Sequence, residues 1–499
     1  MNCRTLMIQG TGSSVGKSVM VAALCRIMYQ DGFRAVPFKS QNMALNSFVT
    51  REGDEMGRAQ VVQAEAAGLE PHVDMNPVLI KPEADARSQV VVMGKPWKTV
   101  SAYDYYKYTP QLLPVIESSL ERLRSQYDAV IIEGAGSPAE INLRRFEIVN
   151  MTIAKLAESP VLMVGDIDKG GVFAQLVGTQ VLLQEEERAL VKGFIINKFR
   201  GDIEILRPGL DMLEERTGVP VLGVVPYYHD IIVNEEDSVH RLDREGEDLL
   251  DIAVIHLPRI SNSTDFEPLQ QEAGVRVRYI NAPWQLGSPD LIIVPGSKST
   301  VSDLNHIRDI GLADEIVSKA REGTRVIGVC GGFQMLGKSI EDPQGVESEQ
   351  KYIEGLGLLD IHTLFEGDKT THQVQAQVVN GDGILAGLGG QSLTGYEIHM
   401  GQTQLGESNS AFRIVQRSGE ENDHLDGAVN PEGTVFGSYL HGLFDNDSFR
   451  HALLENIKPG YRATDRSRLP SKEEQYDKLA ALVRESLDLE QVYRICGLR

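Results

Sequence analysis

The chain has 499 residues, of which 41% are hydrophobic and 24% charged, and its 71 Asp and Glu against 49 Lys and Arg give a formal net charge of −22. This length predicts roughly two to four domains, and the composition is typical of a globular protein with packed cores. So acidic a balance argues against nucleic acid or an anionic membrane as a partner. It leaves room for local basic pockets that bind anionic small molecules.

The cysteines Cys3, Cys25, Cys330 and Cys496 are widely spaced and form no CxxC pair. This spacing fits neither a zinc site nor a disulfide framework and is typical of a protein from a reducing cytosol. The first residues, MNCRTLMIQGTG, lack the features of a signal peptide. No apolar run approaches the roughly 18 residues that would span a bilayer. We therefore expect a cytoplasmic protein.

The first half of the chain alternates short apolar runs with longer amphipathic stretches. The runs that we expect to be buried strands are 5–10, 129–136, 160–168, 193–199 and 221–227. Residues 18–32 have helical spacing and end at a glycine. This alternation predicts a doubly wound α/β domain, with a mainly parallel sheet covered on both faces.

Residues 234–250, NEEDSVHRLDREGEDLL, are polar and rich in both charge signs, and we interpret them as a linker. A second βα series follows, with strands expected near 251–258, 289–297 and 324–332. Residues 471–495 favour an amphipathic helix pair. The predicted units are 1–233, the linker 234–250, a second doubly wound domain 251–448, and a helical tail 449–499.

Residues 6–18 read LMIQGTGSSVGKS, a strand that enters a glycine-rich loop before Gly16-Lys17-Ser18 opens a helix. Such a loop binds phosphates through backbone amides and the helix N-terminus. Lys17 would reach the terminal phosphates of ATP, and Ser18 would ligate Mg²⁺. Thr11 stands where the strict pattern has glycine, so this is a variant loop. The predicted ATP-binding residues are Gly10, Thr11, Gly12, Ser13, Val15, Gly16, Lys17 and Ser18.

A metal carboxylate is also required, and Glu133 ends the apolar run 129–136. The carboxyl ends of parallel strands meet at one sheet edge, so Glu133 would lie beside the phosphate loop. Asp54 and Glu55 are further candidate metal ligands; a charge pair at a helix start is the competing interpretation.

Cys330 lies between an expected strand, VIGVC, and an expected helix, GGFQMLG. A sharp strand-to-helix turn lifts a nucleophile out of the sheet, and the helix N-terminus favours the thiolate. The backbone N–H of Gly331 is placed to stabilise an oxyanion, and Gly296 offers a second donor. A cysteine nucleophile needs a base, and His441 in GSYLHGLF is the candidate.

VCGGFQ and YLHG, at 329–334 and 439–442, resemble the class I (triad-type) glutamine amidotransferases. The resemblance implies that Cys330 forms a γ-glutamyl thioester, that His441 moves protons, and that Gln334 helps to hold glutamine. Most such enzymes carry a glutamate two residues after the histidine to orient it, but this chain has Leu443 there. The group that orients His441 is therefore not identified by the motif.

The first half resembles dethiobiotin synthetase at GTGSSVGKS and EGAGSP. Further stretches resemble the cobyric acid synthase family, the glutamine-hydrolysing kind, and together cover nearly all of the chain. They are PFKSQNMALNS (37–47), EMGRAQVVQAEAAG (55–68), MNPVLIKP (75–82), GDIDKGGVFA (165–174), NKFRGD (197–202) and GYEIHMG (395–401).

This resemblance implies a ligase of cobalamin (vitamin B12) biosynthesis. With ATP, Mg²⁺ and L-glutamine it would amidate the b, d, e and g carboxylates of an adenosylated cobyrinic acid a,c-diamide, through an acyl phosphate. Two active sites on one chain also imply a protected ammonia passage between them. The candidate substrate-binding residues are Lys39, Gln41, Asn42, Lys81, Lys169 and His399. A solvated surface role is the competing interpretation for the lysines, and a structural role for His399.

Two alternatives remain open from the sequence. A cobyrinic acid a,c-diamide synthase would use the same chemistry on other carboxylates, but PFKSQNMALNS favours the first assignment. A phosphate-loop regulator with an inert amidotransferase-like half would tolerate loss of Cys330, Gly331, Gln334 and His441, all of which are present.

Overall fold

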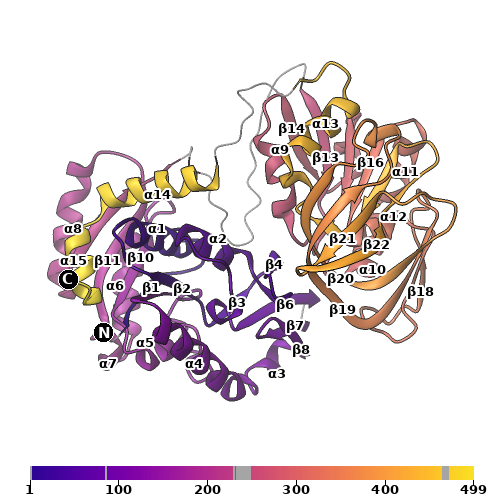
Figure 1. The fold of residues 1–499 in the computed structure, drawn as a ribbon. Helices are drawn as coiled ribbons and strands as arrows, with labels where there is room; N and C mark the ends of the chain where they lie inside the picture. Colours follow the sequence, from indigo (N-terminus) through magenta and orange to yellow (C-terminus); the bar gives the residue numbers. More distant parts are fainter. Residues whose placement is uncertain (1–2, 85–86, 229–230, 232–248, 463–470) are drawn as a thin grey trace.

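The computed structural model describes residues 3–84, 87–228, 231, 249–462 and 471–499. They form two lobes, the first drawn in indigo to magenta and the second in pink to orange (Figure 1). Most of the expected linker, residues 234–248, lies outside the described residues. Each lobe has its own parallel sheet and its own hydrophobic core, so the two fold as separate units of structure.

The first lobe is built on a six-stranded parallel sheet with the order β12-β11-β10-β1-β9-β2. Its strands are β1 (Arg4–Gly10), β2 (Ala35–Phe38), β9 (Ala129–Glu133), β10 (Val161–Asp166), β11 (Val191–Phe199) and β12 (Val221–Pro226). The main helices around it are α1 (Lys17–Gln30), α2 (Arg58–Ala66), α4 (Thr109–Gln126), α5 (Met151–Leu156), α6 (Val172–Leu182) and α8 (Ile203–Thr217). The predicted doubly wound fold of this half is confirmed.

The first lobe also carries two small sheets toward the second lobe, which the apolar patterning did not indicate. One is β3-β6-β7-β8, comprising β3 (Gln41–Met43), β6 (Val78–Ala84), β7 (Arg87–Val92) and β8 (Lys95–Ser101). The other pairs β4 (Ser47–Val49) with β5 (Glu55–Gly57). Figure 1 shows β4 and β6 on the side of the first lobe that faces the second.

The second lobe combines a mainly parallel sheet, β14-β13-β15-β16-β24-β23, with a mixed seven-stranded sheet. The parallel strands are β13 (Leu250–Ile255), β14 (Val275–Ile280), β15 (Leu291–Val294), β16 (Arg325–Val329) and β24 (Val435–Ser438), and β23 (Ala428–Val429) is antiparallel. The mixed sheet is dominated by two long strands, β19 (Ile361–Val378) and β20 (Ser392–Leu405), and ends at β25 (Leu440–His441). The second doubly wound sheet was predicted, but the mixed sheet was not.

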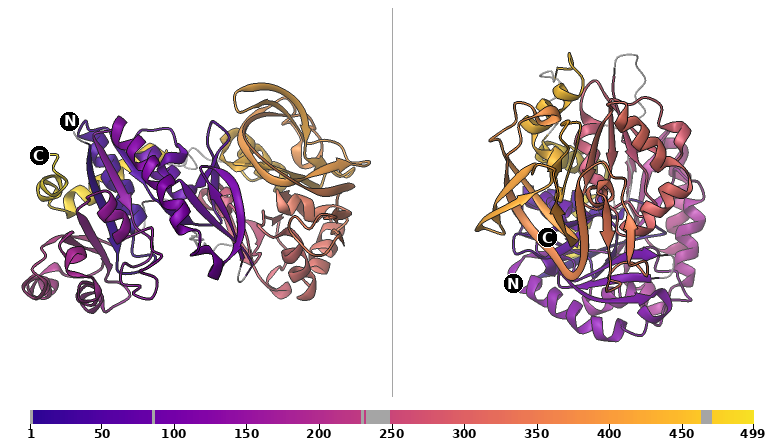
Figure 2. Two further views of the ribbon diagram at one scale, coloured as in Figure 1. Left: turned by 90° about the horizontal axis from the view of Figure 1, so that it is seen from below. Right: turned by 90° about the vertical axis from the view of Figure 1, so that its right-hand side faces the viewer.

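The C-terminal helices return to the first lobe. After α13 (Asp447–Ile457), helix α14 (Lys472–Ser486) packs on α1, and α15 (Leu489–Cys496) packs on β1. Figure 1 and the left view of Figure 2 show these yellow helices on the first lobe. Arg26 of α1 is ion-paired with Asp477 at 2.8 Å and with Glu473 at 2.6 Å. The predicted helix pair is confirmed, and its place links the two ends of the chain.

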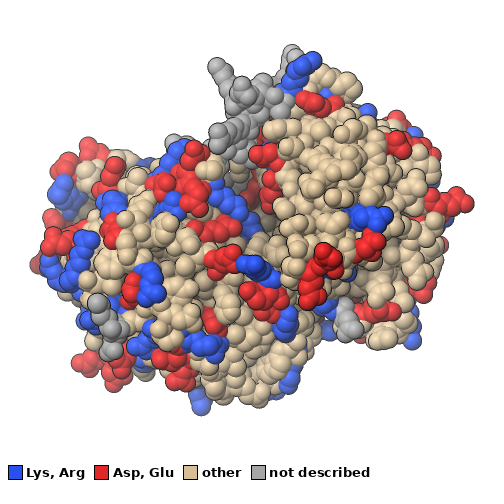
Figure 3. All heavy atoms as spheres, in the orientation of Figure 1, with Lys and Arg blue, Asp and Glu red and all other residues tan. Residues whose placement is uncertain are grey.

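On the face in Figure 3, acidic and basic side chains are interspersed over both lobes. The net charge of −22 is therefore not gathered in one acidic patch on that face. Across the described ranges, no helix combines the length and the hydropathy that crossing a bilayer would require.

Candidate functional site

The phosphate loop connects the end of β1 to the start of α1, in the predicted order. Gly16 has φ of 98°, and an added Cβ would lie 2.1 Å from the side-chain nitrogen of Asn197, so only glycine fits there. The same Asn197 nitrogen donates to the Val15 carbonyl at 2.9 Å and fixes the loop. The Lys17 ammonium donates to the carbonyls of Gly12 at 2.8 Å and Gly136 at 3.2 Å, which holds it over the loop.

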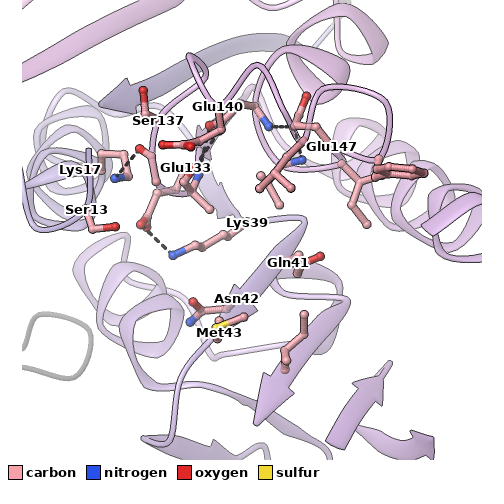
Figure 4. A pocket seen from close by; sticks show the side chains of 18 of the residues that line it. Ser13, Lys17, Lys39, Gln41, Asn42, Met43, Glu133, Ser137, Glu140 and Glu147 are labelled. Carbon is pink, nitrogen blue, oxygen red and sulfur yellow. Dashed lines mark hydrogen bonds and ion pairs between the residues drawn. The ribbon is translucent and has the colours of Figure 1, made fainter. Parts of the chain in front are cut away.

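Glu133 is buried at the carboxyl end of β9, next to β1. Its Oε1 accepts from Ser18 Oγ at 2.8 Å and from Lys39 Nζ at 3.0 Å, and its Oε2 accepts from Gln63. Figure 4 shows Lys39 and Glu133 pointing toward one another. Burial opposes the charged form, but Lys39 and the hydrogen bonds from Gln63 and Ser18 outweigh it and lower the pKa of Glu133. The carboxylate is therefore ionised.

The pair Ser18 and Glu133 fits a Mg²⁺ ion. Magnesium prefers oxygen ligands and is usually held by one or two carboxylates together with substrate phosphates, rather than by a protein cage. Ser18 Oγ and Glu133 Oε1 already lie 2.8 Å apart beside the loop. The described residues contain no group of three or more His, Cys, Asp and Glu arranged to hold a metal.

A cavity of about 520 Å³ opens beside the phosphate loop, large enough for a sizeable ligand. Three of the predicted substrate residues, Lys39, Gln41 and Asn42, line it (Figure 4). Its wall also includes apolar and aromatic side chains that the motifs did not reveal. These are Met43, Ile80, Tyr105, Tyr106, Leu143, Phe146, Ile148 and Val149.

Two predicted metal ligands are placed elsewhere. Glu55 is buried against two lysines, with Lys81 at 2.7 Å and Lys369 of the second lobe in contact. Asp54 is ion-paired with Lys95 at 2.8 Å. Both carboxylates are neutralised by lysines and line no part of the cavity at the phosphate loop, so they are corrected to structural ion pairs.

The remaining substrate candidates do not join the phosphate-loop cavity either. Lys81 and His399 line a second, smaller cavity of about 60 Å³, which contains Cys330. Lys169 is exposed in the loop before α6 and lines neither cavity. The basic candidates thus divide between two sites: Lys39 lines the phosphate-loop cavity, and Lys81 lines the Cys330 cavity. Strand β6 borders both, with Ile80 on the wall of the first and Lys81 on the wall of the second.

Cys330 forms the turn between β16 and α12 (Gly331–Leu336), as the sequence predicts. Its φ of 52° and ψ of −110° are strained for a residue with a side chain, which is typical of a nucleophile turn. An added Cβ at Gly331 would lie 2.9 Å from Ser297 N. The turn thus brings the start of α12 against the loop that holds Gly296. An added Cβ at Gly296 would lie 3.4 Å from His441 Cε1.

His441 is oriented by Asp265, from a short helix, η2 (Ser263–Phe266), that follows β13. His441 Nδ1 lies 2.6 Å from Asp265 Oδ2, and Gly442 N donates to Asp265 Oδ1 at 3.0 Å. Tyr396 stacks on the imidazole with ring centroids 5.1 Å apart. Among the described residues Nε2 has no hydrogen-bond partner, so it is left for Cys330.

The protonation of His441 is set by this arrangement. Burial disfavours the imidazolium, but the negative charges of Asp265 and of the Cys330 thiolate outweigh it and raise the pKa of His441 to about 10. The arrangement therefore favours a proton on the imidazole of His441 at neutral pH. Cys330, His441 and Asp265 are thus arranged as a nucleophile, a base and an orienting group would be.

The wall of the Cys330 cavity comes from both lobes. From the second lobe it includes Gln334, whose Nε2 donates to Met400 O at 2.8 Å and to the Tyr439 hydroxyl at 3.1 Å. From the first lobe it includes Glu83, which pairs with Lys298 of the second lobe at 2.7 Å.

Sequence reasoning missed Asp265, the glutamine Gln63 that contacts Glu133, and Glu83. A usable signal existed for Asp265. The polar run SNSTDF, residues 261–266, follows a strand that is parallel to the strand before Cys330, and such strand ends meet at one edge. Gln63 and Glu83 gave none, because their partners come from distant segments.

Comparison with known proteins gives two domain families. Residues 6–239 match the CobQ/CobB/MinD/ParA nucleotide binding domain, and residues 251–449 match the CobB/CobQ-like glutamine amidotransferase domain. A cobyric acid synthase of Dehalococcoides mccartyi (strain CBDB1) is 53% identical over 496 residues, which is 99% of this chain and 98% of that protein. One of Sorangium cellulosum is 53% identical and covers 100% of this chain and 99% of that protein. One of Desulfitobacterium hafniense (strain DSM 10664 / DCB-2) is 50% identical, with 99% and 98% covered.

Proposed function

The chain belongs to the cobyric acid synthase family, whose members are glutamine-hydrolysing amidoligases, and from this membership we propose how its two sites work together. We propose that the chain amidates the b, d, e and g carboxylates of an adenosylated cobyrinic acid a,c-diamide, with ATP and L-glutamine as co-substrates. One observation carries the proposal: two sites border cavities on the two faces of β6. One is the phosphate loop with its ionised carboxylate, and the other is the Cys-His-Asp centre.

In the first lobe, the phosphate loop and Lys17 would hold the triphosphate of ATP, and Ser18 with Glu133 would hold Mg²⁺, which neutralises phosphate charge. A substrate carboxylate oxygen attacks the γ-phosphorus, and ADP leaves. The product is an acyl phosphate, whose carbonyl carbon is attacked by ammonia; inorganic phosphate leaves and the amide remains. Lys39, Gln41 and Asn42 line the cavity in which the corrinoid carboxylate would have to lie.

In the second lobe, His441 Nε2 takes the proton of the Cys330 thiol, and the thiolate attacks the side-chain amide carbon of glutamine. The backbone amides of Gly331 and Gly296 would stabilise the oxyanion. The imidazolium then returns its proton to the departing nitrogen, and ammonia leaves. Water, deprotonated by His441, hydrolyses the thioester and releases glutamate.

Glutamine also carries an α-ammonium and an α-carboxylate, which need opposite charges in the cavity wall. The wall offers the cation Lys298 together with the carboxylates of Glu83 and Glu347. Glu83 lies on β6, so the first lobe would complete the glutamine site. The position of both cavities on this strand supports a short, protected route for ammonia between the lobes.

The test compares wild type with Cys330→Ala on adenosylated cobyrinic acid a,c-diamide, with ATP and either glutamine or ammonium. We expect Cys330→Ala to lose amidation from glutamine and to keep amidation from ammonium. Cys496→Ala, which changes a buried cysteine beside β1, is the matched control and should keep both. Product from glutamine in Cys330→Ala would contradict the nucleophile. A wild type that amidates only cobyrinic acid would favour the a,c-diamide synthase instead.

A further inference from the structure

The turn that carries Asp265 is held from outside its own lobe. Asn262, at the start of this turn, has φ of 53° and ψ of 44°, a left-handed conformation that asparagine tolerates better than most residues. Within the turn, Asp265 N donates to Asn262 O at 3.0 Å. Asn262 Nδ2 also lies 3.4 Å from His441 Nδ1. The backbone of Asn262 therefore decides where the carboxylate of Asp265 lies.

Two residues of the first lobe bind this turn directly. Ser263 N donates to the side-chain oxygen of Asn46 at 2.9 Å, and Ser47 N donates to the side-chain oxygen of Asn262 at 2.9 Å. All four residues are buried, so these groups have no access to water as a substitute partner. The two bonds form a reciprocal clamp between residues 46–47 and residues 262–263.

Residues 46–47 are themselves fixed within the first lobe and to the histidine's neighbour. Arg58 N donates to Asn46 O at 3.2 Å, and Lys81 Nζ donates to Ser47 Oγ at 3.0 Å. Ser47 O accepts from the hydroxyl of Tyr396, the ring that stacks on His441. Residues 46–47 are therefore hydrogen-bonded both within the first lobe and to the second lobe.

We propose that Asn46 is a positioning residue for the glutaminase centre: through Ser263 and Asn262 it holds Asp265 where Asp265 orients His441. The inference rests on the proposed function and deepens it, since the glutaminase centre then depends on the first lobe. Met43, three residues before Asn46, lines the phosphate-loop cavity, so the clamp starts at the wall of the other active site. A misplacement of about 1 Å in a catalytic group can cost roughly 10²-fold in rate.

The test uses the full chain and the variant Asn46→Ala. We expect glutaminase kcat/KM to fall by about 10²-fold. Asn46→Asp, which keeps an acceptor oxygen for Ser263 N, should recover part of this loss. Thr371→Val is the matched control: it removes another hydrogen bond between the lobes, from Thr371 Oγ1 to Gly53 O at 2.9 Å, and should leave kcat/KM unchanged.

A double-mutant cycle with Asp265→Asn separates positioning from general structural damage. If Asn46 acts through Asp265, Asn46→Ala should cost little in the Asp265→Asn background, whereas independent effects would add. Full additivity, or wild-type kcat/KM in folded Asn46→Ala, would overturn the inference.

The rate at which iodoacetamide alkylates Cys330 gives a readout that needs no glutamine. Displacement of Asp265 lets His441 lose its proton at a lower pH, so alkylation at pH 7 should slow in Asn46→Ala and not in Thr371→Val. Unchanged alkylation in Asn46→Ala contradicts the inference, whereas a wild type that hydrolyses no glutamine contradicts the proposed function alone.

Discussion

His441 Nδ1 lies 2.6 Å from Asp265 Oδ2, although 176 positions separate the two residues in the sequence. The carboxylate fixes the imidazole with its proton on Nδ1 and leaves Nε2 for Cys330. This contact supplies the orienting group that the sequence lacks at Leu443. An acid from η2, the short helix after β13, is thus placed to orient the histidine, as a glutamate near the histidine does in most such enzymes.

Replacing Asp265 by Asn should therefore impair the glutaminase centre severely. We expect kcat/KM for glutamine hydrolysis to fall by roughly 10³–10⁴-fold, because the amide no longer holds the imidazole in the required tautomer. Burial lowers the pKa of His441, but Asp265 and Cys330 together raise it to about 10. Without the charge of Asp265 the imidazolium loses its proton at a lower pH, so the alkaline limb of the kcat/KM profile should move to lower pH.

Asp445→Asn is the control for this prediction. Asp445 is an exposed carboxyl four residues after His441, close to the same site. It makes the same chemical change without touching Nδ1, so the alkaline limb should stay in place. An Asp265→Asn enzyme with a wild-type pH profile would show that another group orients His441.

A second prediction concerns Glu133, whose ionised carboxylate accepts hydrogen bonds from Ser18 and Lys39. Glu133→Gln removes the charge that would hold Mg²⁺ and should lower ammonium-driven amidation by about 10²-fold or more. The measurement is the rate against Mg²⁺ concentration with ammonium as donor, which bypasses Cys330. Glu140→Gln, on the wall of the same cavity, is the control. An unchanged Mg²⁺ dependence in Glu133→Gln would place the metal elsewhere.

A third prediction concerns the buried ion pairs of Glu55 with Lys81 and Lys369, which join the lobes. Glu55→Gln would leave two buried ammonium groups without their anion and should destabilise the protein by about 3–5 kcal/mol. Lys369→Met should cost less, because it leaves one complete pair of Glu55 and Lys81. Thermal unfolding of both variants tests this; equal losses would show that Glu55 is not the common partner.

The pH dependence of this cluster follows from Lys369. Burial lowers the pKa of Lys369 to about 8, although Glu55 opposes this. The folded state then binds fewer protons than the unfolded state between about pH 8 and the unfolded value near 10.4. The cost of burying the ammonium is present below pH 8 and is relieved as the pH rises through this window. Lys369→Met should lack this rise in stability.

The residues that sequence reasoning found all lie in short, continuous motifs. Lys17 and Ser18 are adjacent, Glu133 ends an apolar run, and Cys330 stands between a strand and a helix. Each such motif is local, so backbone geometry alone gives it meaning. The parallel sheets followed from the same apolar runs.

What the sequence did not reveal depends on contacts between distant segments. Asp265 meets His441 through the fold of the second lobe, and Asn46 meets Ser263 and Glu55 meets Lys369 only because the two lobes pack as they do. Glu55 is an example: its position near a helix start, taken alone, favours a metal ligand. Only the lysine that arrives from β19 shows that it is an ion pair across the interface.

The last prediction concerns Glu347, on the wall of the Cys330 cavity. Its Oε1 accepts from Val301 N at 2.9 Å, but desolvation outweighs this bond and raises the pKa of Glu347 to about 7. The folded state therefore holds this proton more tightly than the unfolded state, whose value is about 4.3. The resulting stability is fully present below that value and is lost as the pH rises through 7.

Glu347→Gln should thus lose less stability than wild type between pH 5 and pH 8, as thermal unfolding would measure. Glu349→Gln, an exposed site two residues away, should follow wild type. If bound glutamine places its α-ammonium against Glu347, glutamine should also reduce the stability that wild type loses between pH 5 and pH 8. It should not change this loss in Glu347→Gln. Parallel curves of stability against pH for wild type and Glu347→Gln would exclude both effects.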